Sequence, residues 1–187
     1  MPTLAVIICS TRPGRIGLPI ATWFSSVATA KGTFDVELVD LKAVDLPLFD
    51  EPNHPMLADY THDHTKRWSA IVGRADAFVF VVPEYNHSFN AAIKNAIDFL
   101  HVEWQHKPVG FVSYGGVSGG TRAVQALKPI CAALRMVPSV AAVILPFPQA
   151  HLDEEGTFIG DDLMAGAANG MLDELSRWTG ALETLRS

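Results

Sequence analysis

The feature that most constrains the fold is the regular alternation of short apolar runs with longer amphipathic segments. Runs such as 3–9 and 77–82 have the length and β-branched content of strands that are buried on both faces. Parallel strands need right-handed crossover connections, which the intervening amphipathic segments supply as helices. The pattern therefore predicts an α/β protein, a three-layer α/β/α sandwich around a five-stranded parallel sheet with strand order 2-1-3-4-5.

Five strands and five helices are expected along the chain. The expected strands are 3–9, 35–41 at a sheet edge, 77–82, 109–113 and 139–145. The expected helices are 18–30, 64–75, 90–100, 121–134 and 161–185. Segment 43–61 carries three prolines among acidic residues, so we expect an irregular loop with a functional or subunit-contacting role.

Length and composition limit the class of protein. A chain of 187 residues with 49% hydrophobic residues is expected to form a single domain, 1–187, with a substantial core. Trp104 is expected to lie either in this core or at a subunit interface. A net charge of −6 argues against nucleic acid or an anionic membrane surface as partner. The lack of a long apolar span and of a basic leader predicts a cytoplasmic location, and the distant Cys9 and Cys131 are expected to be reduced and buried.

The first apolar run ends in a candidate anion-binding loop, Ser10-Thr11-Arg12-Pro13-Gly14-Arg15-Ile16-Gly17. The helix that follows offers unpaired backbone N–H groups and the positive end of its dipole. Hydroxyl and guanidinium groups add further donors, so a phosphate fits this loop. An ordinary turn whose arginines face solvent is the alternative.

Two further loops are expected at the same edge of the sheet. In the order 2-1-3-4-5 the carboxyl ends of strands one, three and four surround one crevice. The loop at 83–88 offers backbone amides and Tyr85, and the loop at 113–120 holds four glycines that allow close backbone approach. A planar ring joined to a phosphate would contact all three loops. The helix behind Gly119 and Gly120 is expected to direct its positive end at charge on such a ring, as a reduced flavin requires.

These motifs resemble those of the NADPH-dependent FMN reductase family. The resemblance rests on the segments 10–15 (Ser-Thr-Arg-Pro-Gly-Arg), 83–88 (Pro-Glu-Tyr-Asn-His-Ser), 94–98 (Lys-Asn-Ala-Ile-Asp) and 113–120 (Ser-Tyr-Gly-Gly-Val-Ser-Gly-Gly), in that order. It implies a flavodoxin-like, non-covalent FMN protein that forms a homodimer or a homotetramer. It also implies a reaction in which NADPH or NADH reduces FMN, which then reduces free FMN, quinones or similar small-molecule acceptors.

The resemblance also implies roles for thirteen residues and no metal ligand. The phosphate would be bound by Ser10, Arg12, Arg15, Ile16 and Gly17. The ribityl chain and the ring edge would be contacted by Pro83, Glu84, Tyr85 and Asn86, largely through backbone groups. The pyrimidine side of the ring would be bordered by Ser113, Tyr114, Gly115 and Gly116. No protein side chain is assigned a catalytic role, because the hydride is carried by flavin N5.

The sequence departs from the family pattern at two places, and two other functions stay open. Cys9 replaces a glycine that usually precedes the loop, and Asn90-Ala91 replaces Pro-Gly, although asparagine is suited to a helix N-cap. Cys9 and Arg15 have the C-x5-R spacing of cysteine-dependent phosphatases. A non-enzymatic flavin electron carrier is the other alternative. His62 and His64 lie in a polar cluster that is expected to be solvated rather than to bind a metal.

Overall fold

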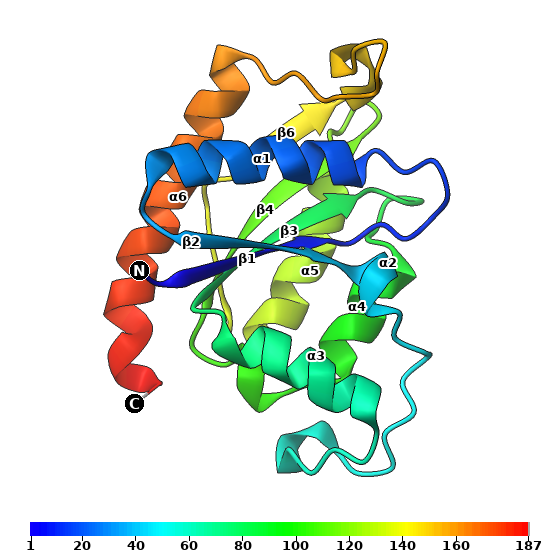
Figure 1. Cartoon of the computed structure of the whole chain (residues 1–187), viewed down its shortest axis with the longest axis vertical. Helices are drawn as coiled ribbons and strands as arrows, with labels where there is room; N and C mark the ends of the chain where they lie inside the picture. The colour runs from blue at the N-terminus through cyan, green and yellow to red at the C-terminus, as the bar shows by residue number, and fades with distance from the viewer. Residues whose placement is uncertain (187) are drawn as a thin grey trace.

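A computed structural model, which describes residues 1–186, shows one sheet between two layers of helices (Figure 1). The strands are β1 Thr3–Ile8, β2 Asp35–Asp40, β3 Ala77–Pro83, β4 Pro108–Gly115, β5 Val137–Pro138 and β6 Val143–Pro146. The α-helices are α1 Gly17–Lys31, α2 Leu41–Val44, α3 Asp63–Arg74, α4 Ala91–Asp98, α5 Thr121–Ala133 and α6 Asp162–Leu182. Four 3₁₀ turns complete the elements, namely η1 Pro55–Leu57, η2 Val102–Trp104, η3 Pro148–His151 and η4 Glu183–Leu185.

The sheet is parallel and its strand order is β2-β1-β3-β4-β5, which confirms the predicted topology and the edge position of β2. Ile8 of β1 is in register with Asp40 of β2 and with Val81 of β3, and Pro83 of β3 is in register with Tyr114 of β4. The carboxyl ends of the strands therefore lie at one edge of the sheet, where the loops that follow β1, β3 and β4 meet (Figure 1).

The expected fifth strand, 139–145, is only partly correct: β5 lies just before this range, residues 139–142 are not in a strand, and β6 begins at Val143, so the sheet has six strands. β5 pairs with the beginning of β4 and β6 with its end. Between them, the Glu174 carboxylate of α6 accepts hydrogen bonds from the backbone N–H groups of Val140 and Ala141 at 3.0 and 2.9 Å. The chain leaves the sheet here because a side chain, instead of a neighbouring strand, satisfies these two donors.

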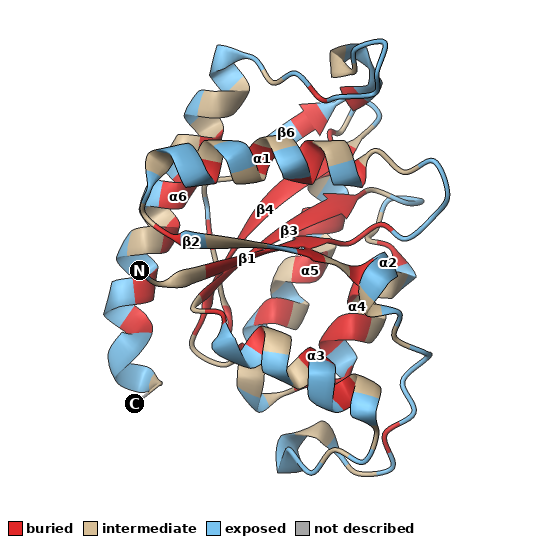
Figure 2. Cartoon of the chain, in the orientation of Figure 1, coloured by how far each residue is buried: buried red, intermediate tan, exposed pale blue. Residues whose placement is uncertain are grey.

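Hydrophobic residues are buried on both faces of the sheet (Figure 2). On one face, the strands pack against α3, α4 and α5 around Trp68 and Trp104, which are fully buried. On the other face, they pack against α1 and α6 around Phe24 and Met171. β3 is buried along its whole length, as its uniformly apolar sequence predicts.

The expected irregular loop at 43–61 includes the end of α2 and the turn η1. Its second half is held by the carboxylate of Glu51, which is buried and accepts hydrogen bonds from the backbone N–H groups of Thr61 and His62 at 2.8 and 3.0 Å. Burial opposes ionisation of Glu51, but the Thr65 side chain together with these two backbone donors outweighs it and lowers the pKa of the carboxyl. A buried acid thus orders a segment that proline content alone suggested to be irregular.

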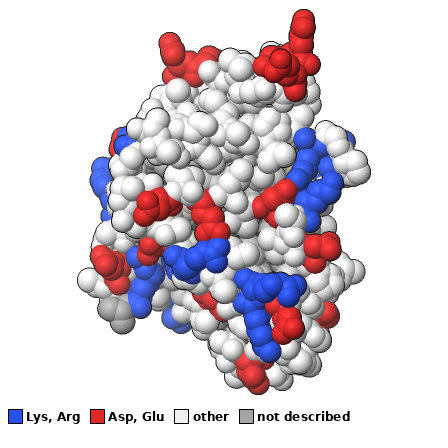
Figure 3. All heavy atoms as spheres, in the orientation of Figure 1, with Lys and Arg blue, Asp and Glu red and all other residues white. Residues whose placement is uncertain are grey.

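Acidic and basic side chains are interspersed over the face of the molecule in Figure 3, without a broad field of one sign. Basic groups do gather at the edge where Figure 1 draws the loop between β1 and α1. None of the helices between residues 1 and 186 combines the length and the apolar character that crossing a bilayer requires.

Trp104 is expected to be a major source of stability, because its ring contacts Trp68, Phe78 and Phe80 and its indole N–H donates to the Ile97 carbonyl at 3.1 Å. Trp104→Ala should lower the free energy of unfolding by about 3–5 kcal/mol, measured by chemical denaturation. Val140→Ala is the control, because Val140 is 85% exposed and should change the value by about 0.5 kcal/mol or less. A Trp104→Ala variant as stable as the control would contradict the assignment of Trp104 to the core.

Candidate functional site

A hollow of about 170 Å³ lies at the carboxyl ends of β1, β3 and β4, where the loops following these strands meet. It contains residues from all three loops that the sequence selected. Ten of the thirteen predicted residues line it: Ser10, Arg12, Arg15, Ile16, Pro83, Glu84, Tyr85, Tyr114, Gly115 and Gly116. Gly17, Asn86 and Ser113 lie outside this lining. The predicted roles of all thirteen stay predictions, but most of these residues share one small space.

The loop between β1 and α1 leads directly to a helix N-terminus. Ile16 occupies the N-cap position of α1 without a side-chain cap, the first turn of α1 holds no acidic residue, and Gly17 is its first residue. The first N–H groups of this helix and the positive end of its dipole therefore have no anionic side chain beside them. This end of α1 is chemically suited to an anion.

The two arginines of this loop have different surroundings. Arg15 forms a two-armed ion pair with Asp40, with its Nη1 atom 2.6 Å from Oδ1, and Nη1 also donates to the Ser10 carbonyl at 2.6 Å. Arg12 is exposed and enters no salt bridge within residues 1–186. Arg15 thus fixes the shape of the loop, while the Arg12 guanidinium is the cation available for an exogenous anion.

The loop after β3 makes a tight turn at Tyr85–Ser88. The backbone N–H of Tyr85 donates to the Ser88 carbonyl at 2.8 Å, and the N–H of Ser88 donates back at 3.0 Å. Asn86 and His87 have φ values of 49° and 66°, in the left-handed region that asparagine and histidine adopt more often than most residues. The Tyr85 hydroxyl lies 3.3 Å from Ser10 Oγ, so the turn contacts the loop after β1. Asn86 is at the exposed tip of the turn, outside the hollow.

The glycine-rich loop after β4 is held by internal contacts. The Ser113 hydroxyl donates to the Gly119 carbonyl at 2.9 Å, so this predicted ring neighbour holds the loop in place from beneath. Gly120 has a φ of 86°, and a Cβ atom there would lie 2.6 Å from the Tyr114 backbone nitrogen. Gly120 is therefore required by close packing within the loop. A Cβ atom on Gly116 would meet open space, so the backbone at Gly116 remains accessible to a ligand.

Glu84 lies beside the N-terminus of α5, the helix end that was expected to face charge on a ring. Its carboxylate accepts hydrogen bonds from the Arg122 backbone N–H at 3.2 Å, from Arg122 Nε at 2.6 Å and from the Ser118 hydroxyl at 2.7 Å. Burial opposes ionisation, but these donors outweigh it and lower the pKa of Glu84. A protein carboxylate therefore already accepts a hydrogen bond at the N-terminus of α5, and the expectation that this helix end faces ring charge stays a prediction.

Two residues of the hollow, Pro148 and Gln149, were missed by the sequence analysis. They belong to η3, which follows β6, the strand that pairs with the end of β4. The carboxyl-end rule that selected the other loops applies to β6 as well.

The two departures from the family pattern contact each other. The Asn90 amide nitrogen donates to the Cys9 backbone carbonyl at 2.6 Å, and Asn90 makes no side-chain cap on α4 although it occupies the N-cap position. Cys9 is fully buried, and burial raises the pKa of its thiol well above the ordinary value. Cys9 Sγ donates to the Ile7 carbonyl at 3.5 Å and packs in the core, outside the lining of the hollow, so Cys9 offers no accessible thiol that would support the C-x5-R hypothesis.

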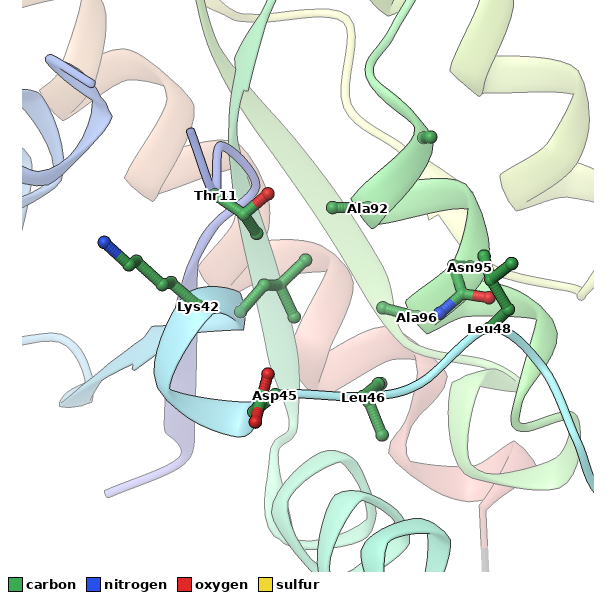
Figure 4. A pocket seen from close by; sticks show the side chains of 10 residues that line it. Thr11, Lys42, Asp45, Leu46, Leu48, Ala92, Asn95 and Ala96 are labelled. Atoms are coloured by element: carbon green, nitrogen blue, oxygen red, sulfur yellow. The ribbon is translucent and has the colours of Figure 1, made fainter. Parts of the chain in front are cut away.

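A second hollow, of about 330 Å³, lies on the other side of the loop after β1 (Figure 4). Its lining is mostly aliphatic and comes from α2, the following loop and α4, with Thr11 and Lys42 at one side (Figure 4). The Asn95 side chain is already used, because it accepts from the Phe49 N–H at 2.9 Å and donates to the Pro47 carbonyl at 2.7 Å. Of the predicted loop, only Thr11 reaches this hollow.

The histidine cluster is held by contacts with Asp50. His64 Nε2 lies 2.9 Å from Asp50 Oδ1, and the His62 and His64 rings stack with their centroids 5.1 Å apart. Within residues 1–186, no group of three or more His, Cys, Asp or Glu side chains is placed to hold a metal ion.

Comparison with known proteins agrees with this arrangement. Residues 2–150 match the model of a family described as NADPH-dependent FMN reductase. A NAD(P)H-dependent FMN reductase of Schizosaccharomyces pombe is 42% identical over 149 residues, which cover 78% of this chain and 74% of that protein. The NAD(P)H-dependent FMN reductase LOT6 of Saccharomyces cerevisiae is 34% identical over 164 residues, 81% of this chain and 85% of that protein.

Solved structures share the fold. The flavoenzyme NAD(P)H:(acceptor) oxidoreductase FerB of Paracoccus denitrificans superposes with a TM-score of 0.74 at 24% identity, covering 97% of this chain and 98% of that one. An archaeal flavodoxin superposes with a TM-score of 0.60 at 14% identity, covering 96% and 99%. These likenesses confirm the flavodoxin-like architecture.

The Arg15–Asp40 pair should contribute to stability in a pH-dependent way. Burial opposes ionisation of Asp40, but hydrogen bonds from Arg15 and from the Lys42 N–H outweigh it and lower the pKa of the carboxyl. Asp40→Asn should therefore lower the free energy of unfolding at pH 7 by about 1 kcal/mol. Because a lowered pKa stabilises only the ionised folded form, the difference from wild type should shrink as the pH falls below about 4.

Urea denaturation at a series of pH values measures this difference. Asp98→Asn is the matched control, because Asp98 pairs with Lys94 on the exposed face of α4 and its loss should cost about 0.5 kcal/mol or less. An Asp40→Asn effect that is independent of pH would show that the ion pair is not its source.

Proposed function

The chain belongs to the NADPH-dependent FMN reductase family, and from this membership we propose that the hollow at the ends of β1, β3 and β4 is where it holds FMN for NAD(P)H-dependent reduction of small acceptors. The observation that carries the proposal is the convergence of ten predicted residues from three separate loops on one space. The loop after β1 supplies hydrogen-bond donors for a phosphate. The loop after β3 supplies a backbone turn for a linear chain, and the loop after β4 supplies a glycine-lined wall for a planar ring.

The residues present fit the phosphate of such a cofactor. The N-terminus of α1 has no side-chain cap. Within residues 1–186, Arg12 enters no salt bridge, and the buried Tyr114 hydroxyl makes no hydrogen bond of good geometry. Helix N-termini and arginine side chains are the usual ligands of phosphates in proteins. Arg15 supports this group by fixing the loop through Asp40.

FMN, when bound, supplies the hydride chemistry between the nicotinamide and the acceptor. The chain's part is to bind and orient it: Gly115 and Gly116 form a wall with accessible backbone at Gly116, and Tyr85 stands on the opposite loop. A hollow of about 170 Å³ is smaller than the roughly 300–1,000 Å³ of most ligand pockets. One chain can therefore enclose the phosphate end, while a ring face remains accessible to NAD(P)H and to an acceptor.

A non-enzymatic electron carrier has less support, because the matching family and the most similar relatives reported above are reductases. The acceptor of this chain is proposed to be free FMN, a quinone or a similar small molecule, in line with a quinone reductase of Pseudomonas putida that is 28% identical over 85% of this chain.

Assembly and location complete the proposal. We place the chain in the cytoplasm as a homodimer or homotetramer, acting on small molecules and binding neither nucleic acid nor membrane. Two free, buried cysteines are typical of a reducing compartment. Exposed apolar side chains of the segment 43–61, such as Leu48 at 84%, which lines the second hollow, and Phe49 at 42%, are available for burial between subunits. Light scattering of the purified holoprotein measures the subunit number.

The proposed activity is tested by the visible spectrum of the purified full-length protein. We expect flavin absorbance that bleaches when NADPH or NADH is added under argon and returns when a quinone is added. A protein that stays colourless after incubation with FMN and removal of the excess would contradict the proposal.

Arg12→Ala should raise the dissociation constant for FMN by about 10-fold or more, because it removes a charged donor from the phosphate. Fluorescence titration of the flavin-free protein measures the constant. Arg67→Ala is the matched control, because Arg67 is an exposed residue of α3 away from the hollow. An FMN affinity in Arg12→Ala equal to that of the control would remove Arg12 from the phosphate site.

A further inference from the structure

Tyr114 lies at the end of β4, but its side chain belongs to the layer of α1 and α6. It is 6% exposed and packs in the same cluster as Ile8 and Ile20, on the α1 side of the sheet. The family resemblance implies that Tyr114 borders the pyrimidine side of a flavin ring together with Gly115 and Gly116. In the structure its ring runs beneath the start of α1 instead.

The Tyr114 hydroxyl lies beside Gly17, the first residue of α1. A Cβ atom on Gly17 would lie 2.6 Å from Tyr114 Oη, so only glycine leaves room for the hydroxyl at this helix end. Tyr114 Oη is buried and makes no hydrogen bond of good geometry among residues 1–186, although the Ser10 hydroxyl, which lies 3.3 Å from Tyr85 Oη, also faces it. A buried hydroxyl without a partner is costly, and native proteins usually retain one only where a ligand or a water completes it.

The helix end beside it also lacks a partner. The N-cap residue Ile16 offers no side-chain acceptor, and the first turn of α1 contains no acidic residue. α5 provides the contrast within the same molecule, because Glu84 accepts from the Arg122 N–H in its first turn. An uncapped helix end and an unpartnered hydroxyl at the same point are two independent indications of an anion that bears acceptor oxygens.

We propose that Tyr114 binds the phosphate of FMN through its hydroxyl, at the N-terminus of α1, and so makes the site select FMN over riboflavin. The proposal rests on the proposed function. It moves Tyr114 from the ring to the phosphate, beside Arg12. Burial raises the pKa of Tyr114, so its hydroxyl keeps its proton at neutral pH and acts as a donor. The expected contact is a hydrogen bond from Tyr114 Oη to a phosphate oxygen, with no proton transfer.

The comparison of FMN with riboflavin isolates this contact, because riboflavin has the same ring and ribityl chain without the phosphate. Dissociation constants of both flavins are measured by fluorescence titration of the flavin-free, full-length protein. Wild type is compared with Tyr114→Phe, which removes only the hydroxyl. Tyr60→Phe is the matched control, because the Tyr60 hydroxyl donates to Glu103 Oε2 at 3.0 Å, away from the hollow.

Tyr114→Phe is expected to weaken FMN binding by about 10-fold, equivalent to about 1.4 kcal/mol, and to leave riboflavin binding unchanged. Tyr60→Phe should change neither constant. Equal weakening of FMN binding and riboflavin binding would assign Tyr114 to the ring and overturn the proposal. An unchanged dissociation constant for FMN would also overturn the proposal. A wild-type protein that binds neither flavin would instead overturn the proposed function.

The apo form of Tyr114→Phe should unfold at a temperature equal to or above that of wild type, because it loses an unsatisfied buried group. If this variant does not fold, Tyr114→Met removes the same hydroxyl with another apolar side chain, and the same two constants apply. Inorganic phosphate gives a separate readout: it should raise the unfolding temperature of apo wild type more than that of the hydroxyl-free variant. Equal stabilisation of both would count against the phosphate role.

Discussion

The parallel pairing of β1, β3 and β4 is the constraint on which the rest of the structure depends. Parallel strands point their carboxyl ends the same way, and the register of Ile8 with Val81 and of Pro83 with Tyr114 ends the three strands close together. Segments that are far apart in the sequence thereby become walls of one hollow. The cores on both faces of the sheet fix this register, since a slip of one residue would turn buried side chains toward the wrong face.

The charged groups around the hollow are divided between those the protein satisfies and those it leaves for a ligand. Asp40 engages Arg15, and Glu84 engages Arg122 and the start of α5, so these pairs hold the loops in one shape. Such internal pairs prepare a site before a ligand arrives and reduce the ordering that binding requires. Arg12 and the N-terminus of α1 have no such partner within residues 1–186, and they define where an anion is expected.

The two departures from the family motifs also have a structural explanation. Cys9 packs its side chain into the core, and the Asn90 amide donates to the Cys9 carbonyl across 81 positions of sequence. The turn that a glycine usually forms is therefore held here by a hydrogen bond from the loop before α4. Considered separately, each change suggests a looser or chemically different site, whereas in contact they support the same loop.

The sequence by itself determined the fold class, the strand order, the family and the three loops, because apolar periodicity and short motifs are local properties of the chain. It did not determine the two short strands around residues 139–142, the place of Pro148 and Gln149, or the direction of the Tyr114 side chain. These depend on contacts between distant residues: Glu174 satisfies the amides at 140 and 141, β6 ends beside β4, and Gly17 leaves space for a hydroxyl from β4. A local pattern shows which groups a loop can offer, but only packing in three dimensions decides which of them are already satisfied by the protein and which remain for a ligand.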